Sequence, residues 1–290
     1  MWLILSLVNA SVSGLQNAYY KRAAIQINPI LMAWSVLVVS GLLFSPLLLL
    51  GIPKLDSIFW ITVAIRLILD SAAFVLYIKG VQMAPLSLTI PMTSLVPIFS
   101  IATVFLVNHQ APSLLGLIGV VTIVAGLYFL NFDRDTKHLL SPFQAILRQK
   151  GVLYVAIAAI LWSIIIALQK LAIDHTSVNF YVAFFQLLWA ACFTPIAFLA
   201  DRRGFLSLFK PSLAKKLIPS GMFDAVQVYA QFSAYLFAIP VYVMAVSSTA
   251  ILFSSFFGWY FFREKVKAHL IPTILIVVGV IILALAQMPR

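Results

Sequence analysis

The chain has 290 residues, of which 63% are hydrophobic and 9% are charged, and its mean hydropathy is +1.08. Soluble domains carry about 25% charged residues, so the composition excludes a soluble fold and predicts a polytopic membrane protein. The net charge of +11 comes from Lys and Arg in short loops beside apolar runs, a pattern typical of membrane proteins that contact anionic lipid. Nucleic-acid binding is excluded because no soluble domain could present a basic face.

Ten apolar runs are long enough to cross a membrane, which takes about 20 residues per helix. The first five cover residues 2–20, 29–50, 57–78, 84–107 and 113–132, and the second five cover 152–173, 179–200, 217–237, 239–261 and 269–287. We therefore predict an all-α polytopic membrane protein with ten transmembrane helices. Residues 1–132 form a first five-helix repeat, 133–150 a polar connector, and 151–290 a second five-helix repeat.

The two halves carry the same pattern. A shift of 154 positions brings Asp70 to Asp224 and Ser94 to Ser248, and the surrounding hydropathy stays in register. Because each repeat has an odd number of spans, the second repeat is expected to be inverted relative to the first. Inverted repeats are typical of secondary transporters, whose binding site lies near the midplane between the repeats.

The charge of the loops predicts an orientation. Fifteen Lys and Arg residues follow the odd-numbered spans, whereas the opposite side holds only Lys54, Lys170 and Arg290. Cytoplasmic loops carry the excess of positive charge, so this count places both termini outside.

Two acidic residues lie inside apolar runs, where a charge is costly and marks a functional site. Asp70 follows Arg66 by one helical turn, a spacing that allows either a structural ion pair or a proton or cation site. Asp224 lacks such a partner and begins a polar stripe that continues through Gln227, Gln231 and Tyr235. Capping of a nearby helix start is the structural alternative for Asp224.

Further polar and aromatic side chains are candidates for the same cavity. They are Asn17 and Tyr20 on the first helix, Tyr77 on the third, and Trp162 and Gln169 on the sixth. Interhelical hydrogen bonds or core packing would explain such residues equally well. Pro91 and Pro97 are expected to leave backbone carbonyls without a hydrogen-bond donor in the fourth helix. These prolines have either a structural role in orienting the site or the simpler effect of kinking the helix.

The sequence contains no motif for catalysis or cofactors. His109, His138, His175 and His269 have no metal-binding spacing, and there is no nucleophile elbow, P-loop or dinucleotide-binding turn. We therefore expect no enzyme activity, metal or cofactor, and any transport must be passive or driven by a gradient. The single Cys192 lies in an apolar run and is expected to be buried.

Several segments resemble the EamA-type family of the drug/metabolite transporter superfamily. They are LWSIIIALQK, APLSLTIPMTSLVPIF and FFGWYFFREK with Glu264, together with Gly116, Gly119 and Gly126 at helix-packing positions. The chain departs from the family pattern at His109–Gln110, Ile251 and Ser13. The resemblance implies a ten-helix carrier that works by alternating access, and it implies cytoplasmic termini, against the loop charge.

These observations favour a secondary transporter that moves a small polar metabolite, such as an amino acid, sugar or nucleobase derivative, with proton coupling as one option. The alternatives are a multidrug exporter of lipophilic cations and, from another class, a lipid enzyme or a scaffold without transport activity. The expected partners are the small-molecule substrate and membrane lipids, in a monomer or homodimer. The expected location is a bacterial inner membrane.

Overall fold

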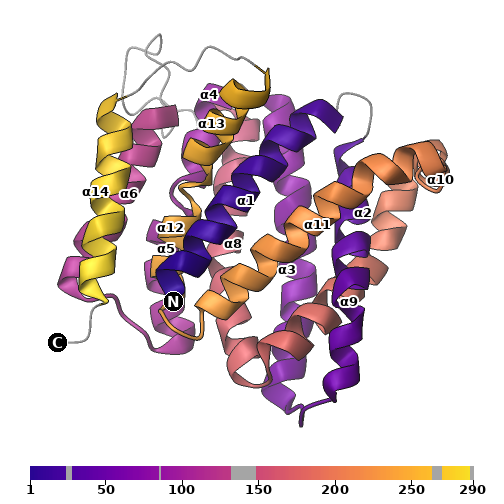
Figure 1. Cartoon of the computed structure of the whole chain (residues 1–290), viewed down its shortest axis with the longest axis horizontal. Helices are drawn as coiled ribbons and strands as arrows, with labels where there is room; N and C mark the ends of the chain where they lie inside the picture. The colour runs from indigo at the N-terminus through magenta and orange to yellow at the C-terminus, as the bar shows by residue number, and fades with distance from the viewer. Residues whose placement is uncertain (24–27, 85, 132–147, 263–269, 288–290) are drawn as a thin grey trace.

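The computed structural model describes residues 1–23, 28–84, 86–131, 148–262 and 270–287. Most of the expected connector lies outside these ranges, as do His138, Glu264 and His269. In the described part of the chain every regular element is a helix (Figure 1).

The first half contains α1 (Trp2–Ala23), α2 (Pro29–Phe44), the short 3₁₀ helix η2 (Ser45–Leu50), α3 (Ser57–Met83), α4 (Leu86–Thr93), α5 (Val96–Asn108) and α6 (Leu114–Asn131). The second half contains α8 (Lys150–Asp174), α9 (Val178–Ala200), the short α10 (Arg202–Ser207), α11 (Pro211–Ala234), α12 (Pro240–Ser247), α13 (Ala250–Phe262) and α14 (Leu270–Ala286).

Polar residues at the loop ends set the starts of α2, α3 and α9. The side chain of Asn28 accepts a hydrogen bond from the Ile30 amide at 2.9 Å, and that of Asp56 accepts one from the Phe59 amide at 2.8 Å. Ser177 caps α9 in the same way. Such side chains satisfy amides that have no partner within the helix.

The fourth and ninth expected spans are each divided into two helices. The first break lies at Ser94–Leu95, between α4 and α5, and the second at Ser248–Thr249, between α12 and α13. Pro97 lies in the first turn of α5, a position that needs no amide donor. In the second break, Ser248 donates to the Met244 carbonyl at 2.8 Å and thereby satisfies a helix end.

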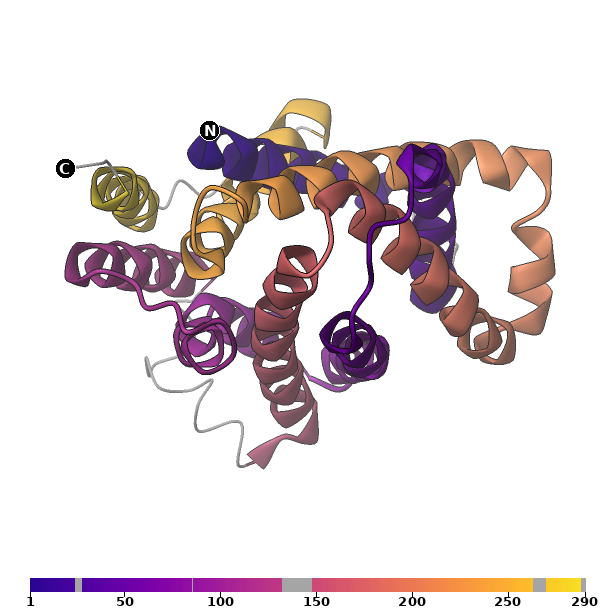
Figure 2. The ribbon, with the colours of Figure 1, turned by 90° about the horizontal axis from the view of Figure 1, so that it is seen from below.

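The helices of the two halves pack against one another in matching pairs. Helix α3 packs on α8, and its counterpart α11 packs on α1; likewise α5 packs on α8, and α13 packs on α1. The pairs α2–α9 and α6–α14 each join equivalent helices of the two halves. In Figure 1 and Figure 2, α6 and α14 lie together at one edge of the bundle, and α10 lies at the other.

Glycines allow the pair α6–α14 to pack closely. A Cβ atom on Gly279 would lie 2.6 Å from Ile123, and one on Gly119 would lie 2.9 Å from Leu283, so α6 and α14 are in direct backbone contact. On Gly126 it would lie 2.7 Å from Ile276. The expected close packing of the helix that contains Gly116, Gly119 and Gly126 is confirmed, although Gly116 faces Tyr242 of α12.

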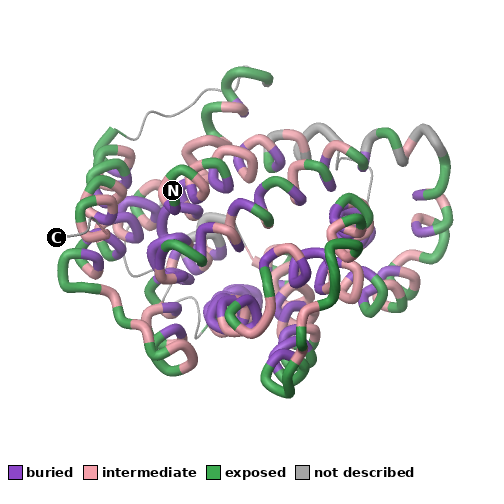
Figure 3. The backbone as a smooth tube through the Cα atoms, turned by 60° about the horizontal axis from the view of Figure 1, so that its bottom comes forward, coloured by how far each residue is buried: buried purple, intermediate pink, exposed green. Residues whose placement is uncertain are grey.

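The outer faces of the bundle are apolar. Within the described ranges, five segments could each cross a membrane by length and composition: Pro29–Leu50, Ser57–Met83, Lys150–Asp174, Val178–Ala200 and Pro240–Phe261. Three shorter apolar helices accompany them: Val96–Asn108, Leu114–Leu130 and Leu270–Ala286. Figure 3 shows that burial is concentrated where helices face one another. The expectation for Cys192 was wrong, because this residue lies on an exposed face of α9.

Candidate functional site

A cavity of about 320 Å³ lies among α2, α3, α8, α9, α11 and α12. Six predicted residues line it: Arg66, Asp70, Trp162, Gln169, Asp224 and Gln231. Both halves of the chain therefore contribute to one cavity, and the two acidic residues that are 154 positions apart both face it. Its volume is at the lower end of the range for small-molecule sites, which is about 300–1,000 Å³.

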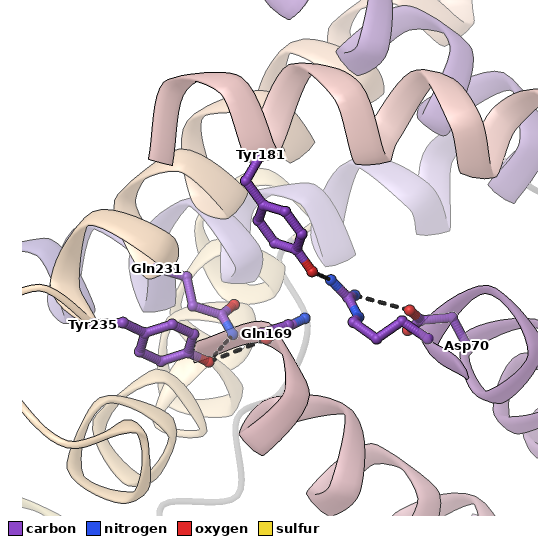
Figure 4. Close-up of polar contacts among 6 residues, drawn as sticks. Asp70, Gln169, Tyr181, Gln231 and Tyr235 are labelled. Atoms are coloured by element: carbon purple, nitrogen blue, oxygen red, sulfur yellow. Dashed lines mark hydrogen bonds and ion pairs between the residues drawn. The ribbon is translucent and has the colours of Figure 1, made fainter. Parts of the chain in front are cut away.

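Asp70 forms an ion pair with Arg66. The two side chains are 2.8 Å apart at Nη2 and Oδ2, and both residues are buried. Arg66 also donates to the hydroxyl of Tyr181 (Figure 4). Its guanidinium lies 3.9 Å from the ring centroid of Phe185. The ion pair is thus neutral as a unit and is enclosed by aromatic residues of α9.

Asp224 lies in the middle of α11, so the capping alternative does not apply. Its Oδ2 accepts a hydrogen bond from Nε2 of Gln186 at 2.9 Å, and the same nitrogen donates to Ser40 Oγ at 3.0 Å. Gln186 also lines the cavity and is buried, although the sequence analysis did not predict it as a site residue. A glutamine in the middle of the apolar run 179–200 was the signal that could have found it.

A chain of three polar side chains joins α8 to α11. Gln231 Nε2 donates to the hydroxyl of Tyr235 at 2.7 Å, and that hydroxyl donates to Gln169 Oε1 at 3.3 Å (Figure 4). Tyr235 is buried behind the two glutamines and does not line the cavity. Its position makes it a support that orients both amides.

Gln227 points toward α1 and away from the cavity. Its amide oxygen accepts from Ser13, its amide nitrogen donates to Gln16, and its backbone carbonyl accepts from Asn9 at 2.7 Å. Gln16 in turn donates to the carbonyl of Ser220 at 2.9 Å. We refer to this set of contacts between α1 and α11 as the amide ladder; it gives both the amide oxygen and the amide nitrogen of Gln227 a protein partner.

The other predicted residues lie apart from the central cavity. Asn17 lines a second cavity of about 250 Å³ that also touches both helix breaks, at Ser94 and Ser248. Tyr77 packs on Trp162, with ring centroids 5.2 Å apart. The side chains of Tyr20 and Pro91 lie outside the described part of the structure.

Aromatic and aliphatic side chains form most of the cavity wall. The aromatic residues are Trp162, Phe185, Trp189 and Phe232, and the aliphatic ones include Leu37, Ile165 and Val228. Among the described residues, no group of three His, Cys, Asp or Glu side chains could hold a metal ion. The cavity can therefore bind an amphipathic small molecule through its walls and a few polar groups.

An apolar helical bundle with carboxylates and amides in an internal cavity defines an integral membrane protein with a polar site. The model of the EamA-like transporter family matches residues 1–132 and 149–285. The chain therefore belongs to this family, within the drug/metabolite transporter superfamily, and is a membrane transporter.

The fold has been seen before. A solved crystal structure aligns with the chain at a TM-score of 0.74 and 16% sequence identity, and the alignment covers 97% of each chain. At this level of identity the similarity concerns the fold alone. No curated protein sequence matches the chain.

Proposed function

We propose that the chain is a secondary transporter that moves a small polar metabolite by alternating access, with the central cavity as its binding site. One observation carries the proposal: Asp70 and Asp224, equivalent residues of the two halves, line the same cavity. A site between repeats is what an alternating-access carrier requires.

The proposal includes ten spans in two inverted five-helix repeats, residues 1–132 and 151–290, with a connector at 133–150. The matching helix pairs support it, since α3–α8 and α11–α1 are equivalent contacts. The helix breaks support it too, because Ser94 and Ser248 occupy the same place in the two halves. Broken helices are common in transporters.

Asp224 is the proposed site of proton coupling. Its described contact at Oδ2 is an amide donor, Gln186. Among the residues that the structure describes, Arg66 is the one basic residue that lines the cavity, and it is paired with Asp70. A carboxylate without a cationic partner can exchange a proton for a cargo in the course of transport.

The alternative cargo is a lipophilic cation, and the four aromatic residues of the cavity wall favour it. We further propose that the protein lies in a bacterial inner membrane as a monomer or homodimer. Small-molecule substrate, protons and lipids are its proposed partners.

The test is flux into liposomes that contain the purified protein. Internal pH is followed while a panel of amino acids, sugars, nucleobase derivatives and cationic dyes is supplied outside. The proposal predicts uptake or release of at least one compound class, with proton counterflow in the wild type and neither flux nor counterflow in Asp224→Asn. Wild-type flux in that variant would exclude Asp224 as the proton site.

A further inference from the structure

Three charged side chains line the central cavity in the described part of the chain: Arg66, Asp70 and Asp224. Arg66 and Asp70 neutralise each other across 2.8 Å. This leaves one carboxylate, that of Asp224, as the uncompensated charge of the cavity. A charge in a low-dielectric site requires an opposite charge or a proton.

Arg66 is not available to a cargo. Its two terminal nitrogens contact Asp70 and Tyr181, and Phe185 covers the face of the guanidinium at 3.9 Å. With 2% of its surface exposed, the residue is enclosed by protein. A carboxylate or phosphate on a cargo would therefore find no free cation among the described residues of the cavity, and it would be repelled by Asp224.

The carboxylate of Asp224, by contrast, is held in a defined position. Gln186 donates to one of its oxygens at 2.9 Å and is itself fixed by a contact of 3.0 Å with Ser40 on α2. An amide donor orients a carboxylate without neutralising it, so the negative charge is retained for a ligand. Gln186 is thus a positioning residue for this group.

The aromatic residues that line the cavity near Asp224 can bind the apolar part of a cationic molecule. Phe185, Trp189 and Phe232 line the same cavity, and aromatic faces attract organic cations as well as apolar bodies. We infer that the cavity selects an organic monocation, a protonated amine with a flat apolar body, which pairs with the carboxylate that Gln186 orients. This inference rests on the proposed transport function and, of the two cargo classes proposed above, favours the organic cation.

Four compounds that share a phenyl group but differ in charge test whether the charge of the cargo, and not its shape, determines binding. Phenethylamine is a cation, phenylalanine a zwitterion, 3-phenylpropionate an anion and phenethyl alcohol neutral. Binding of each to the detergent-purified protein is measured by calorimetry at neutral pH, and flux is measured separately in liposomes. We expect phenethylamine to bind at least about 30-fold more tightly than the other three, the effect of one buried charge pair.

Two variants complete the test. Asp224→Asn should lose this preference, whereas Asp224→Glu, which keeps the charge, should retain it; thermal unfolding confirms that both are folded. Equal binding of phenylalanine and phenethylamine, binding of none of the four, or full preference in Asp224→Asn would each overturn the inference. Selective phenethylamine binding without flux of any compound would support it and count against transport instead.

Discussion

Asp70 and Asp224 occupy equivalent positions 154 residues apart, yet the first contacts a guanidinium and the second an amide. The two carboxylates consequently have different chemical roles within one cavity. Asp70 forms part of a fixed neutral pair, and Asp224 keeps an unbalanced charge.

Removing Arg66 alone should destabilise the protein strongly. The Arg66→Met variant leaves Asp70 buried without a counter-charge, which costs about 3–5 kcal/mol in comparable cases. The double variant Arg66→Met/Asp70→Leu removes both charges and should recover most of that loss. Thermal unfolding in detergent measures both; a double variant as unstable as the single one would contradict the role of a neutral structural pair.

The Gln186→Leu variant should weaken substrate binding and leave the fold intact. It removes a hydrogen bond to a charged group, worth about 1.5–3 kcal/mol, so KM should rise roughly 10- to 100-fold with a smaller change in kcat. Asn179→Ala on the same helix is the control, because Asn179 accepts from Tyr229 and does not line the cavity. Equal KM values for the two variants would refute a positioning role for Gln186.

The contact between α6 and α14 should not tolerate a larger residue at position 279. In Gly279→Ala the new Cβ would lie 2.6 Å from the Ile123 side chain and 2.8 Å from its backbone nitrogen. Such overpacking costs about 1–3 kcal/mol, and the melting temperature should fall. Val278→Ala, on the exposed face of the same helix, should change it little.

Asp56 links the two halves outside the cavity and should make stability sensitive to acid. Its Oδ1 accepts from the Phe59 amide, and its Oδ2 lies 2.6 Å from Nδ1 of His175 at the end of α8. The amide contact, followed by the contact with His175, lowers the pKa of Asp56 below its usual value of 3.8. A lowered pKa stabilises the folded state above pH 3.8, and this stabilisation is lost as the pH falls through the folded-state pKa.

The corresponding measurement compares the wild type with Asp56→Asn, which can still cap α3 but cannot titrate. The wild type should have the higher melting temperature at neutral pH, and the difference should disappear in acid. A difference that persists well below the usual pKa of a carboxyl group would show that the ionised form of Asp56 is not the stabilising one.

Much of the helical architecture could be predicted from the sequence, because long apolar runs bounded by Asn28, Asp56 and Ser177 specify helices directly. The prolines indicated a kink in the fourth expected span, but the break at Ser248 could not be predicted. Hydropathy averaged over a span does not detect two non-helical residues, and the second break contains no proline. Ten membrane spans and their inversion remain predictions.

The cavity was predicted in part. Periodicity placed Asp224, Gln227 and Gln231 on one stripe of α11, but it cannot tell which neighbour each residue faces. Gln227 contacts α1, and Gln231 lines the cavity. Gln186 was not predicted because it is a single polar residue in an apolar run. The prediction for Cys192 was wrong because an apolar helix has a lipid-facing side as well as a buried one.

The glycine contact between α6 and α14 and the amide ladder between α1 and α11 permit different movements of the helices. Backbones that touch at Gly119 and Gly279 leave no room for one helix to slide over the other, since each turn would bring a side chain into the gap. The amide ladder between α1 and α11 has donors and acceptors at successive turns and can form new pairs after a shift. We therefore expect α6 and α14 to stay together as the stationary axis of any rocking motion, and α1 to change its contacts with α11.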